Sequence, residues 1–354
     1  MVKLQTARRM VLSSVLLATL TGCGTLFDDS ALFLVGTAGD TVYLQNFGSY
    51  SGYTTLPSTL WGLDLSTGDA TKLQAARVQY DVQAAGDYFV AERPMNDNHA
   101  SRIVAVQIST GAELTILERN VSLGGRYDRA FVLTGARVVA RTETGLLVYD
   151  LATRAIERTV AVDDPIVEIL AADAHWALVT RNSVPSGDHL LVRLDTGAAR
   201  VIPAEPAGRQ ALFFDAAIVG EELFTGASLV DENGLAIGNE ILALDLDDLT
   251  WETWATYDAY TPSRLSSRAV YVCGADETRV LVEYLNPLAS DRVEVITRAT
   301  GARTTLTEQT GIFTSTLNPR LEGDRVYWLS SLPNALVVHD LVSAARDVVS
   351  FVLQ

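Results

Sequence analysis

A short motif that recurs along the chain constrains the fold more than any other feature. In its first copy an apolar run, Leu60–Leu63, precedes Asp64-Leu65-Ser66-Thr67-Gly68, and another run follows. Six later positions correspond to Asp64, namely Gln107, Asp150, Arg193, Asp245, Thr297 and Asp340. The intervals between the seven positions are 43, 43, 43, 52, 52 and 43 residues. The sequence therefore predicts a strand, a tight turn and a returning strand seven times over, which is typical of a repeat architecture.

This repeat predicts a β-propeller. A period of about 40–45 residues with several strands per copy is typical of propeller blades, each a four-stranded antiparallel sheet. A second signal is a small residue before an apolar strand, as at Gly39, Gly86 and Gly220, which suits a tight hairpin. We therefore expect an all-β, seven-bladed β-propeller over residues 31–354, with strands A to D counted from the axis outward. The last blade should pack against the first without an exchange of strands.

The first 30 residues have the composition of an export signal. Residues 1–22 join a basic start (Lys3, Arg8, Arg9) to an apolar run, Met10–Leu20, that is too short to span a bilayer. Leu20-Thr21-Gly22-Cys23 then resembles the lipobox of bacterial lipoproteins.

The resemblance implies that Cys23 is acylated, becomes the first residue of the mature protein and anchors it to a membrane of the cell envelope. Residues 23–30 would be a short tether. Gly24 in place of Asp resembles an outer-membrane sorting signal in cells with two membranes.

The charge of the mature chain is strongly negative. Three of the 27 basic residues lie in residues 1–22, which contain no acid, so 24 basic and 43 acidic residues remain and the formal net charge is −19. Such a surface repels phosphate backbones, so a nucleic-acid partner is not expected.

The recurrent motif resembles a known group of propellers. Leu63–Gly68 and Val106–Gly111 are similar to repeats of the quinoprotein-like, YVTN-type and Trp-Asp-repeat propeller superfamily. The quinone-binding members imply eight blades, a Trp four residues after the Gly and a vicinal cysteine pair. Here Lys72 and Thr115 stand at that Trp position and Cys273 is the only cysteine besides Cys23, so no quinone or other cofactor is expected.

No familiar catalytic or metal-binding motif is present in the sequence. The four histidines show no metal-ligand spacing, and Cys273 lies in an apolar strand, which favours a buried structural thiol. No catalytic residue or metal ligand is assigned. Oxygen-rich segments such as Asp231–Gly234 resemble calcium loops only in part, and a solvated loop is the favoured interpretation.

The spacing of the motifs predicts which face of the propeller binds. The B–C and D–A connections emerge on one face and hold most of the excess length, in residues 46–58, 231–239 and 257–266. Exposed aromatic side chains with a polar rim are typical of recognition surfaces. The candidate binding face is Phe47, Tyr50, Tyr53, Asp231, Glu232, Tyr257, Asp258 and Tyr260. Neutral insertions in tolerant loops remain the alternative.

Three functions are compatible with these features. The first is a membrane-anchored, non-enzymatic propeller that binds a protein, peptide or glycan of the envelope. The second is a hydrolase or lyase of envelope polymers with its site at the channel mouth, and the third is a structural component. Because unrelated functions share this fold, the fold does not decide between them.

Overall fold

The computed structural model of the chain describes residues 31–47, 59–75, 82–95, 100–120, 129–163, 166–181, 189–257, 269–285, 290–310, 319–329 and 335–353. Every regular element in these segments is a strand, and none of them holds a helix that is long and apolar enough to cross a membrane. The predicted signal peptide (1–22) and the tether with Cys23 (23–30) lie outside the described residues.

The strands fall into six sheets in the described part of the chain. The first sheet has eight strands, β1 (Ala31–Ala38), β2 (Thr41–Phe47), β3 (Thr59–Asp64), β4 (Ala70–Ala75), β5 (Val82–Ala85), β6 (Tyr88–Pro94), β7 (Ala100–Gln107) and β8 (Glu113–Asn120). The second sheet consists of β9 (Phe131–Thr134), β10 (Arg137–Arg141), β11 (Gly145–Asp150) and β12 (Ala155–Ala161). The third consists of β13 (Ile166–Ala172), β14 (Trp176–Arg181), β15 (His189–Arg193) and β16 (Ala199–Val201).

The remaining three sheets have the same four-stranded order. They are β17 (Arg209–Val219), β18 (Glu222–Val230), β19 (Ala236–Asp245), β20 (Trp251–Thr256); β21 (Ala269–Ala275), β22 (Arg279–Leu285), β23 (Ser290–Thr297), β24 (Arg303–Thr310); and β25 (Arg320–Glu322), β26 (Arg325–Leu329), β27 (Ala335–Asp340), β28 (Arg346–Ser350).

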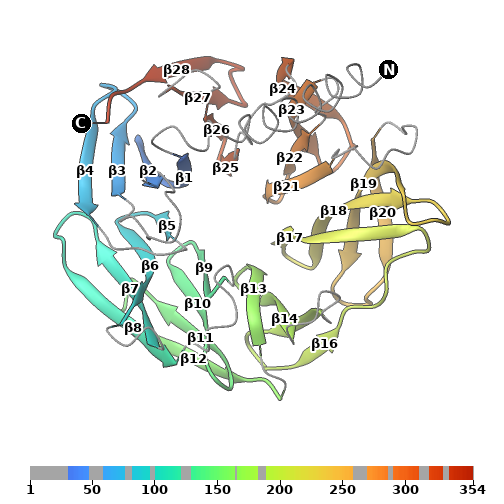
Figure 1. Cartoon of the computed structure of the whole chain (residues 1–354), viewed down its shortest axis with the longest axis horizontal. Coiled ribbons are helices and arrows are strands. Elements are labelled where there is room, and N and C mark those ends of the chain that lie inside the picture. Colours follow the sequence, from blue (N-terminus) through green and yellow to red (C-terminus); the bar gives the residue numbers. More distant parts are fainter. Residues whose placement is uncertain are drawn as a thin grey trace, which may run out of the picture.

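The sheets surround a central axis like the blades of a propeller, with the first strand of each meander innermost (Figure 1). The predicted all-β propeller of four-stranded antiparallel meanders is thus confirmed. The sheet count is six rather than the predicted seven because β1 and β5 pair in parallel, through Gly36↔Ala84 and Thr37↔Ala85, and join two meanders into one sheet.

Gly36 permits this junction. A Cβ atom at Gly36 would lie 1.8 Å from the carbonyl oxygen of Ala84, so any other residue would force the two axial strands apart. A β-bulge between Leu34 and Gly36 turns β1 toward its neighbour.

Successive meanders are held together by apolar layers. The central strands are buried on both faces because each face packs against an adjacent sheet. In β11, for example, the five consecutive residues from Gly145 to Tyr149 are all buried. One such layer joins Val90 and Ile103 of the first sheet to Phe131, Val138 and other residues of the second.

The ring closes by packing, as expected. All four strands of the last sheet come from residues 320–350, and an apolar cluster joins Leu34 and Trp61 to Tyr327 and Phe351. At the surface Arg325 Nη1 lies 3.1 Å from Asp40 Oδ1. The two ends of the described chain therefore meet without an exchange of strands.

The recurrent motif forms a tight turn whose role is structural. In the first copy the Gly68 N–H donates to the Asp64 carbonyl at 2.8 Å, and Asp64 Oδ1 accepts from the Ser66 N–H at 2.8 Å and the Thr67 N–H at 3.2 Å. In all seven copies the residue after the Asp64 position donates its N–H to a carbonyl of the A–B turn, as Leu65 does to Asp40. The A–B and C–D turns thus form one tight face of the propeller, hereafter the tight-turn face.

Three copies lack the glycine and keep the same backbone conformation. Arg154, Leu249 and Ala344 have φ values of 55°, 59° and 55°. A left-handed conformation costs a non-glycine residue about 1–2 kcal/mol, so the surrounding hydrogen bonds, such as Leu249 N–H to Asp245 O at 3.0 Å, must hold it.

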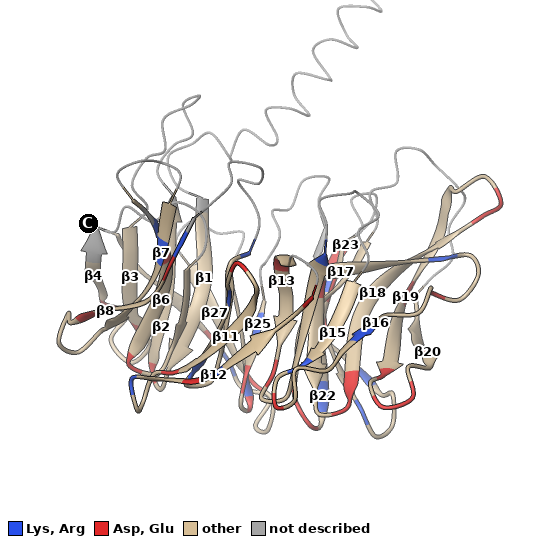
Figure 2. Cartoon of the chain, turned by 90° about the horizontal axis from the view of Figure 1, so that it is seen from below, with Lys and Arg blue, Asp and Glu red and all other residues tan. Residues whose placement is uncertain are grey.

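Charged residues gather on the tight-turn face, along the lower edge in Figure 2. Many of the acids there accept hydrogen bonds within their own turns, as Asp64 and Asp340 do. Those contacts hold the pKa of both carboxyl groups below the usual range, through Ser66 at Asp64 and through Ser343 at Asp340.

Candidate functional site

The candidate site is a cavity of about 260 Å³ among the axial strands. Its polar lining consists of Gln83 on β5, Arg129 just before β9, and Arg320, the first residue of β25. Its apolar lining includes Ala171, Ala172, Ala216 and Ala217 of β13 and β17. Small residues of the innermost strands therefore line this space near the axis of the ring (Figure 1).

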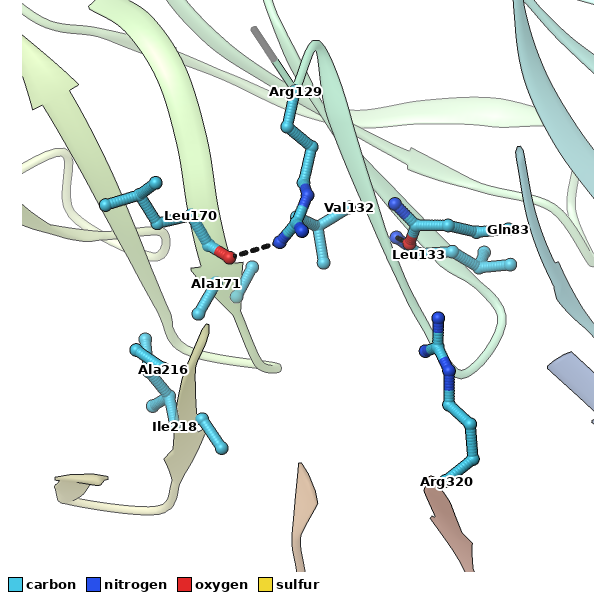
Figure 3. A pocket seen from close by; sticks show the side chains of 11 residues that line it. Gln83, Arg129, Val132, Leu133, Leu170, Ala171, Ala216, Ile218 and Arg320 are labelled. Carbon is cyan, nitrogen blue, oxygen red and sulfur yellow. Dashed lines mark hydrogen bonds between the residues drawn. The ribbon is translucent and has the colours of Figure 1, made fainter. Parts of the chain in front are cut away.

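Arg129 is held in a fixed orientation by the neighbouring sheet. Its Nη1 donates to the Leu170 carbonyl at 2.7 Å, and its backbone N–H and C=O contact Glu168 Oε1 at 3.3 Å and the Ile169 N–H at 3.0 Å. Figure 3 shows the guanidinium group of Arg129 directed into the cavity from one edge and that of Arg320 from the opposite edge.

Gln83 contributes to the frame of the cavity. Its Nε2 donates to the Phe131 carbonyl at 3.2 Å and its Oε1 accepts from the Leu133 N–H at 2.8 Å. The side-chain amide thus pairs with the free edge of β9 as a further strand residue would. It holds the second and third meanders at a defined distance on the axis.

A wide bulge in β17 places an acid near the axis. The register of β17 and β18 jumps between Leu212↔Gly226 and Ala217↔Phe224, so residues 213–216 stand opposite Thr225 alone. Asp215 lies in this insertion, and bulges are known to re-aim side chains in this way. Phe213 of the same bulge packs against His189, with ring centroids 4.3 Å apart.

Asp215 has a perturbed pKa and also influences the pKa values of neighbouring groups. Burial raises its pKa from 3.8 to about 6, and the positive charge of Arg129 partly opposes that shift. Burial also raises the pKa of Tyr271, with a further contribution from the charge of Asp215. Burial, assisted by the charges of Glu283 and Asp215, raises the pKa of the Cys273 thiol well above its ordinary value, which disfavours the reactive thiolate and agrees with the predicted structural role.

A second cavity, of about 190 Å³, opens on the tight-turn face between strands β10–β12 and the β13–β14 and β15–β16 turns. Its polar groups are paired with one another, since Arg137 Nη2 lies 2.8 Å from Glu157 Oε1 and Arg158 Nη1 donates to the Leu194 carbonyl at 2.9 Å. We therefore regard the axial cavity as the better candidate. In the described residues no group of three or more His, Cys, Asp or Glu side chains could hold a metal ion.

The structure gives part of the predicted binding face a different role. Tyr257, expected to be exposed, is only 4% exposed, so that expectation is wrong. Its ring stacks on Tyr284 of the next sheet at 5.0 Å, and its hydroxyl donates to Glu294 Oε2 at 3.0 Å. Arg303 covers the ring at 4.4 Å from the centroid. Tyr257 is thus a core residue between two sheets.

The fifth repeat contains less loop than expected. Residues 236–239, predicted as part of a long connection, belong to β19 and pair with β18 through Val230↔Ala236 and Ser228↔Asn239. Only a turn remains, in which Asp231 Oδ1 accepts from the Asn233 N–H at 2.9 Å and the Leu235 N–H at 2.8 Å.

Glu232 is exposed on this turn, and Phe47 is the last residue of β2. The remaining predicted site residues, Cys23, Tyr50, Tyr53, Asp258 and Tyr260, lie outside the described residues. The structure therefore does not bring the predicted binding face together as a whole.

No sequence pattern predicts the group of polar residues near the axis, which consists of Gln83, Arg129, Asp215 and Arg320. One signal was present, namely Asp215 within an otherwise apolar run, Phe213–Val219, in a strand expected to be innermost. A carboxylate in such a run is costly unless it has a function or a partner.

No protein-family model matches this chain, and no curated protein matches it. Solved structures do match. The β-propeller domain of the Trilobed protease from Pyrococcus furiosus, described as having an open velcro topology, has a TM-score of 0.58 and 11% identity, over 91% of this chain and 98% of that one. A puromycin hydrolase mutant has a TM-score of 0.57 and 14% identity, over 93% of this chain and 55% of its own length.

The oligogalacturonate lyase from Vibrio parahaemolyticus has a TM-score of 0.52 and 12% identity, over 88% of this chain and 89% of that one. At such low identities the likeness extends to the fold alone. Together with the strand order, these similarities establish that the chain has the β-propeller fold.

Proposed function

We propose that this protein is a lipid-anchored, non-enzymatic binding module of the cell envelope, with a protein, peptide or glycan as its ligand. The observation that carries the proposal is the axial cavity. Its polar groups are Arg320 together with Arg129 and Gln83, and the side chains of these last two residues are held by hydrogen bonds to backbone carbonyl groups. Ordered donors around a concave, partly apolar space are typical of binding sites. The tight-turn face, by contrast, uses many of its acids to close its own turns.

The anchor is tested by replacing Cys23. The expected result is that Cys23→Ser moves the protein from the membrane fraction to the soluble fraction, because two or more acyl chains are what hold such proteins stably. Cys273→Ser is the matched control and should stay in the membrane fraction. A Cys23→Ser protein that resists carbonate extraction would contradict the anchor.

The binding role is tested by placing a photo-crosslinking residue on each face in intact envelopes. Glu232, on the β18–β19 turn, reports on one face, and Val342, which is 77% exposed on a C–D turn, reports on the tight-turn face. Adducts are expected at position 232 and not at 342, and their sensitivity to protease or glycosidase identifies the ligand class. Equal labelling at both positions, or none, would contradict the proposal.

A second function has one observation in its favour. A carboxyl group with a pKa of about 6 suits a general acid or base. Asp215 has such a pKa and directly precedes Ala216, which lines the cavity. This favours the hydrolase or lyase alternative. Loss of envelope-polymer cleavage in Asp215→Asn, with cleavage retained in Glu232→Gln, would support it.

A further inference from the structure

We propose that the axial cavity binds one small carboxylate-bearing molecule between the guanidinium groups of Arg129 and Arg320. This inference goes beyond the proposed function, since it assigns a small ligand to the axial cavity in addition to the envelope partner and names the residues that hold it.

The two arginines come from distant parts of the chain and converge on one space. Arg129 precedes β9 and Arg320 begins β25, so both lie at the end of an axial strand that is away from its tight A–B turn. Figure 3 shows their guanidinium groups directed toward the same volume from opposite edges. Arginine presents five N–H donors in a planar fork that matches a carboxylate, and such pairs are charge-assisted.

Arg129 is ordered before any ligand arrives. The bond from its Nη1 to the Leu170 carbonyl at 2.7 Å fixes the plane of the guanidinium group and leaves its other N–H groups for further contacts. A donor that is already ordered loses less conformational entropy on binding, which favours affinity.

The size and lining of the cavity favour a small organic acid. Its volume of about 260 Å³ lies below the roughly 300–1,000 Å³ of pockets for drug-sized ligands. Ala171 and Ala216 leave room for a short aliphatic group beside the polar edge.

The local charge favours a monoanion over a phosphate. Two acids lie near Arg129: Glu168, whose Oε1 is 3.3 Å from the Arg129 backbone N, and Asp215, which interacts electrostatically with Arg129. A ligand with two negative charges would meet more repulsion from these acids than one with a single charge.

The test is isothermal titration calorimetry of the full chain in detergent micelles with defined probes. N-acetylalanine is the carboxylate probe, N-acetylalanine amide is its uncharged match, and inorganic phosphate is the alternative anion. We expect the acid to bind at least about 10-fold more tightly than the amide, since hydrogen bonds to charged groups contribute about 1.5–3 kcal/mol.

Arg320→Gln is the most informative variant. Arg320 is exposed at a strand end, so its replacement should leave the fold intact. It should weaken binding of the acid by about 10-fold or more, and so should Arg129→Gln. Arg102→Gln, at an arginine of the third strand of its meander with 39% side-chain exposure, is the control and should bind like the wild type. A hexapeptide of alanine with a free carboxyl end tests whether the site prefers the end of a peptide chain to a small free acid. Whether the hexapeptide or N-acetylalanine binds more tightly, a carboxylate site is supported.

Three outcomes would overturn the inference. They are no binding of the acid, equal binding of acid and amide, or unchanged binding in Arg320→Gln. Tighter binding of phosphate than of the acid would overturn the choice of a monocarboxylate as well. None of these results changes the crosslinking pattern at positions 232 and 342, so failure of this inference is distinguishable from failure of the proposed function.

Discussion

Replacing Asp215 with Asn should change the pH dependence of stability in a direction that follows from its surroundings. Asp215 lies in the β17 bulge at the axis, where burial raises its pKa from 3.8 to about 6 and the charge of Arg129 opposes only part of that rise. Burial disfavours the charged form because the carboxylate loses its hydration.

The sign and size of the effect follow from proton linkage. Between the two pKa values the folded protein keeps a proton that the unfolded chain has released, so the free energy of unfolding falls as pH rises through this window. From pH 5 to pH 8 the wild type should lose about 1.4 kcal/mol through this one group. Asn cannot titrate, so Asp215→Asn should gain about that amount relative to the wild type over the same range.

Urea unfolding of both proteins at pH 5 and pH 8 measures this difference, and the comparison cancels groups that titrate alike in both proteins. Asp64→Asn serves as a control that should show almost no change between pH 5 and pH 8. The Ser66 hydroxyl and the backbone N–H groups of Ser66 and Thr67 lower the Asp64 pKa from 3.8, so this group affects stability only at more acidic pH. A stability difference between Asp215→Asn and the wild type that is constant with pH, or that grows toward pH 5, would refute the reasoning.

Two further predictions concern packing and are measured by the same unfolding assay. Gly36→Ala should lower the free energy of unfolding by about 3 kcal/mol, because its Cβ would lie 1.8 Å from the Ala84 carbonyl oxygen. Gly39→Ala, with φ +59° and nothing within 4 Å of its Cβ, should cost only about 1 kcal/mol, and the reverse order would contradict the role given to Gly36. Tyr257→Phe should lower the free energy of unfolding by about 1–3 kcal/mol, because buried Glu294 loses a hydrogen bond. An unchanged free energy of unfolding would contradict the core role given to Tyr257.

The tight-turn face could be predicted because its chemistry is local. Asp64, Thr67 and Gly68 bond to one another within five residues, so the sequence contains both partners of each contact in one window. The same local bonds explain why Leu249 and Ala344 keep the left-handed conformation without glycine. The count of seven meanders follows from this periodic signal, whereas the parallel pairing of β1 with β5 depends on one close approach at Gly36.

Burial of Tyr257 could not be predicted because it depends on residues of the next repeat. Tyr257 follows β20 directly, at the start of a connection, where an aromatic residue resembles part of a recognition loop. Its partners Tyr284 and Glu294 lie 27 and 37 residues further on. Contacts between neighbouring sheets cannot be recognised from a short stretch of the sequence.

The axial site could not be predicted for the same reason. Only the unusual length of the fifth repeat was visible in the sequence. Gln83, Arg129 and Arg320 belong to different meanders, and no spacing links them before the ring is formed. The fifth repeat, however, is longer than most, and its spacing predicts the excess length in connecting loops. The structure places much of it in β17, β18 and β19, which have 11, 9 and 10 residues.

That extra length explains why one repeat carries two unusual features. The additional residues of β17 form the bulge that brings Asp215 toward Arg129, and the additional residues of β18 and β19 extend the hairpin that ends at Asp231 and Glu232. A bulge needs a long, well-paired partner strand to hold its displaced residues, because an unpaired bulge would leave buried backbone groups without hydrogen bonds. The long hairpin supplies that support through the pairs from Arg209↔Leu229 to Leu212↔Gly226. The bulge that holds Asp215 and the long hairpin that ends at Asp231 and Glu232 are therefore both features of the long strands of this one sheet.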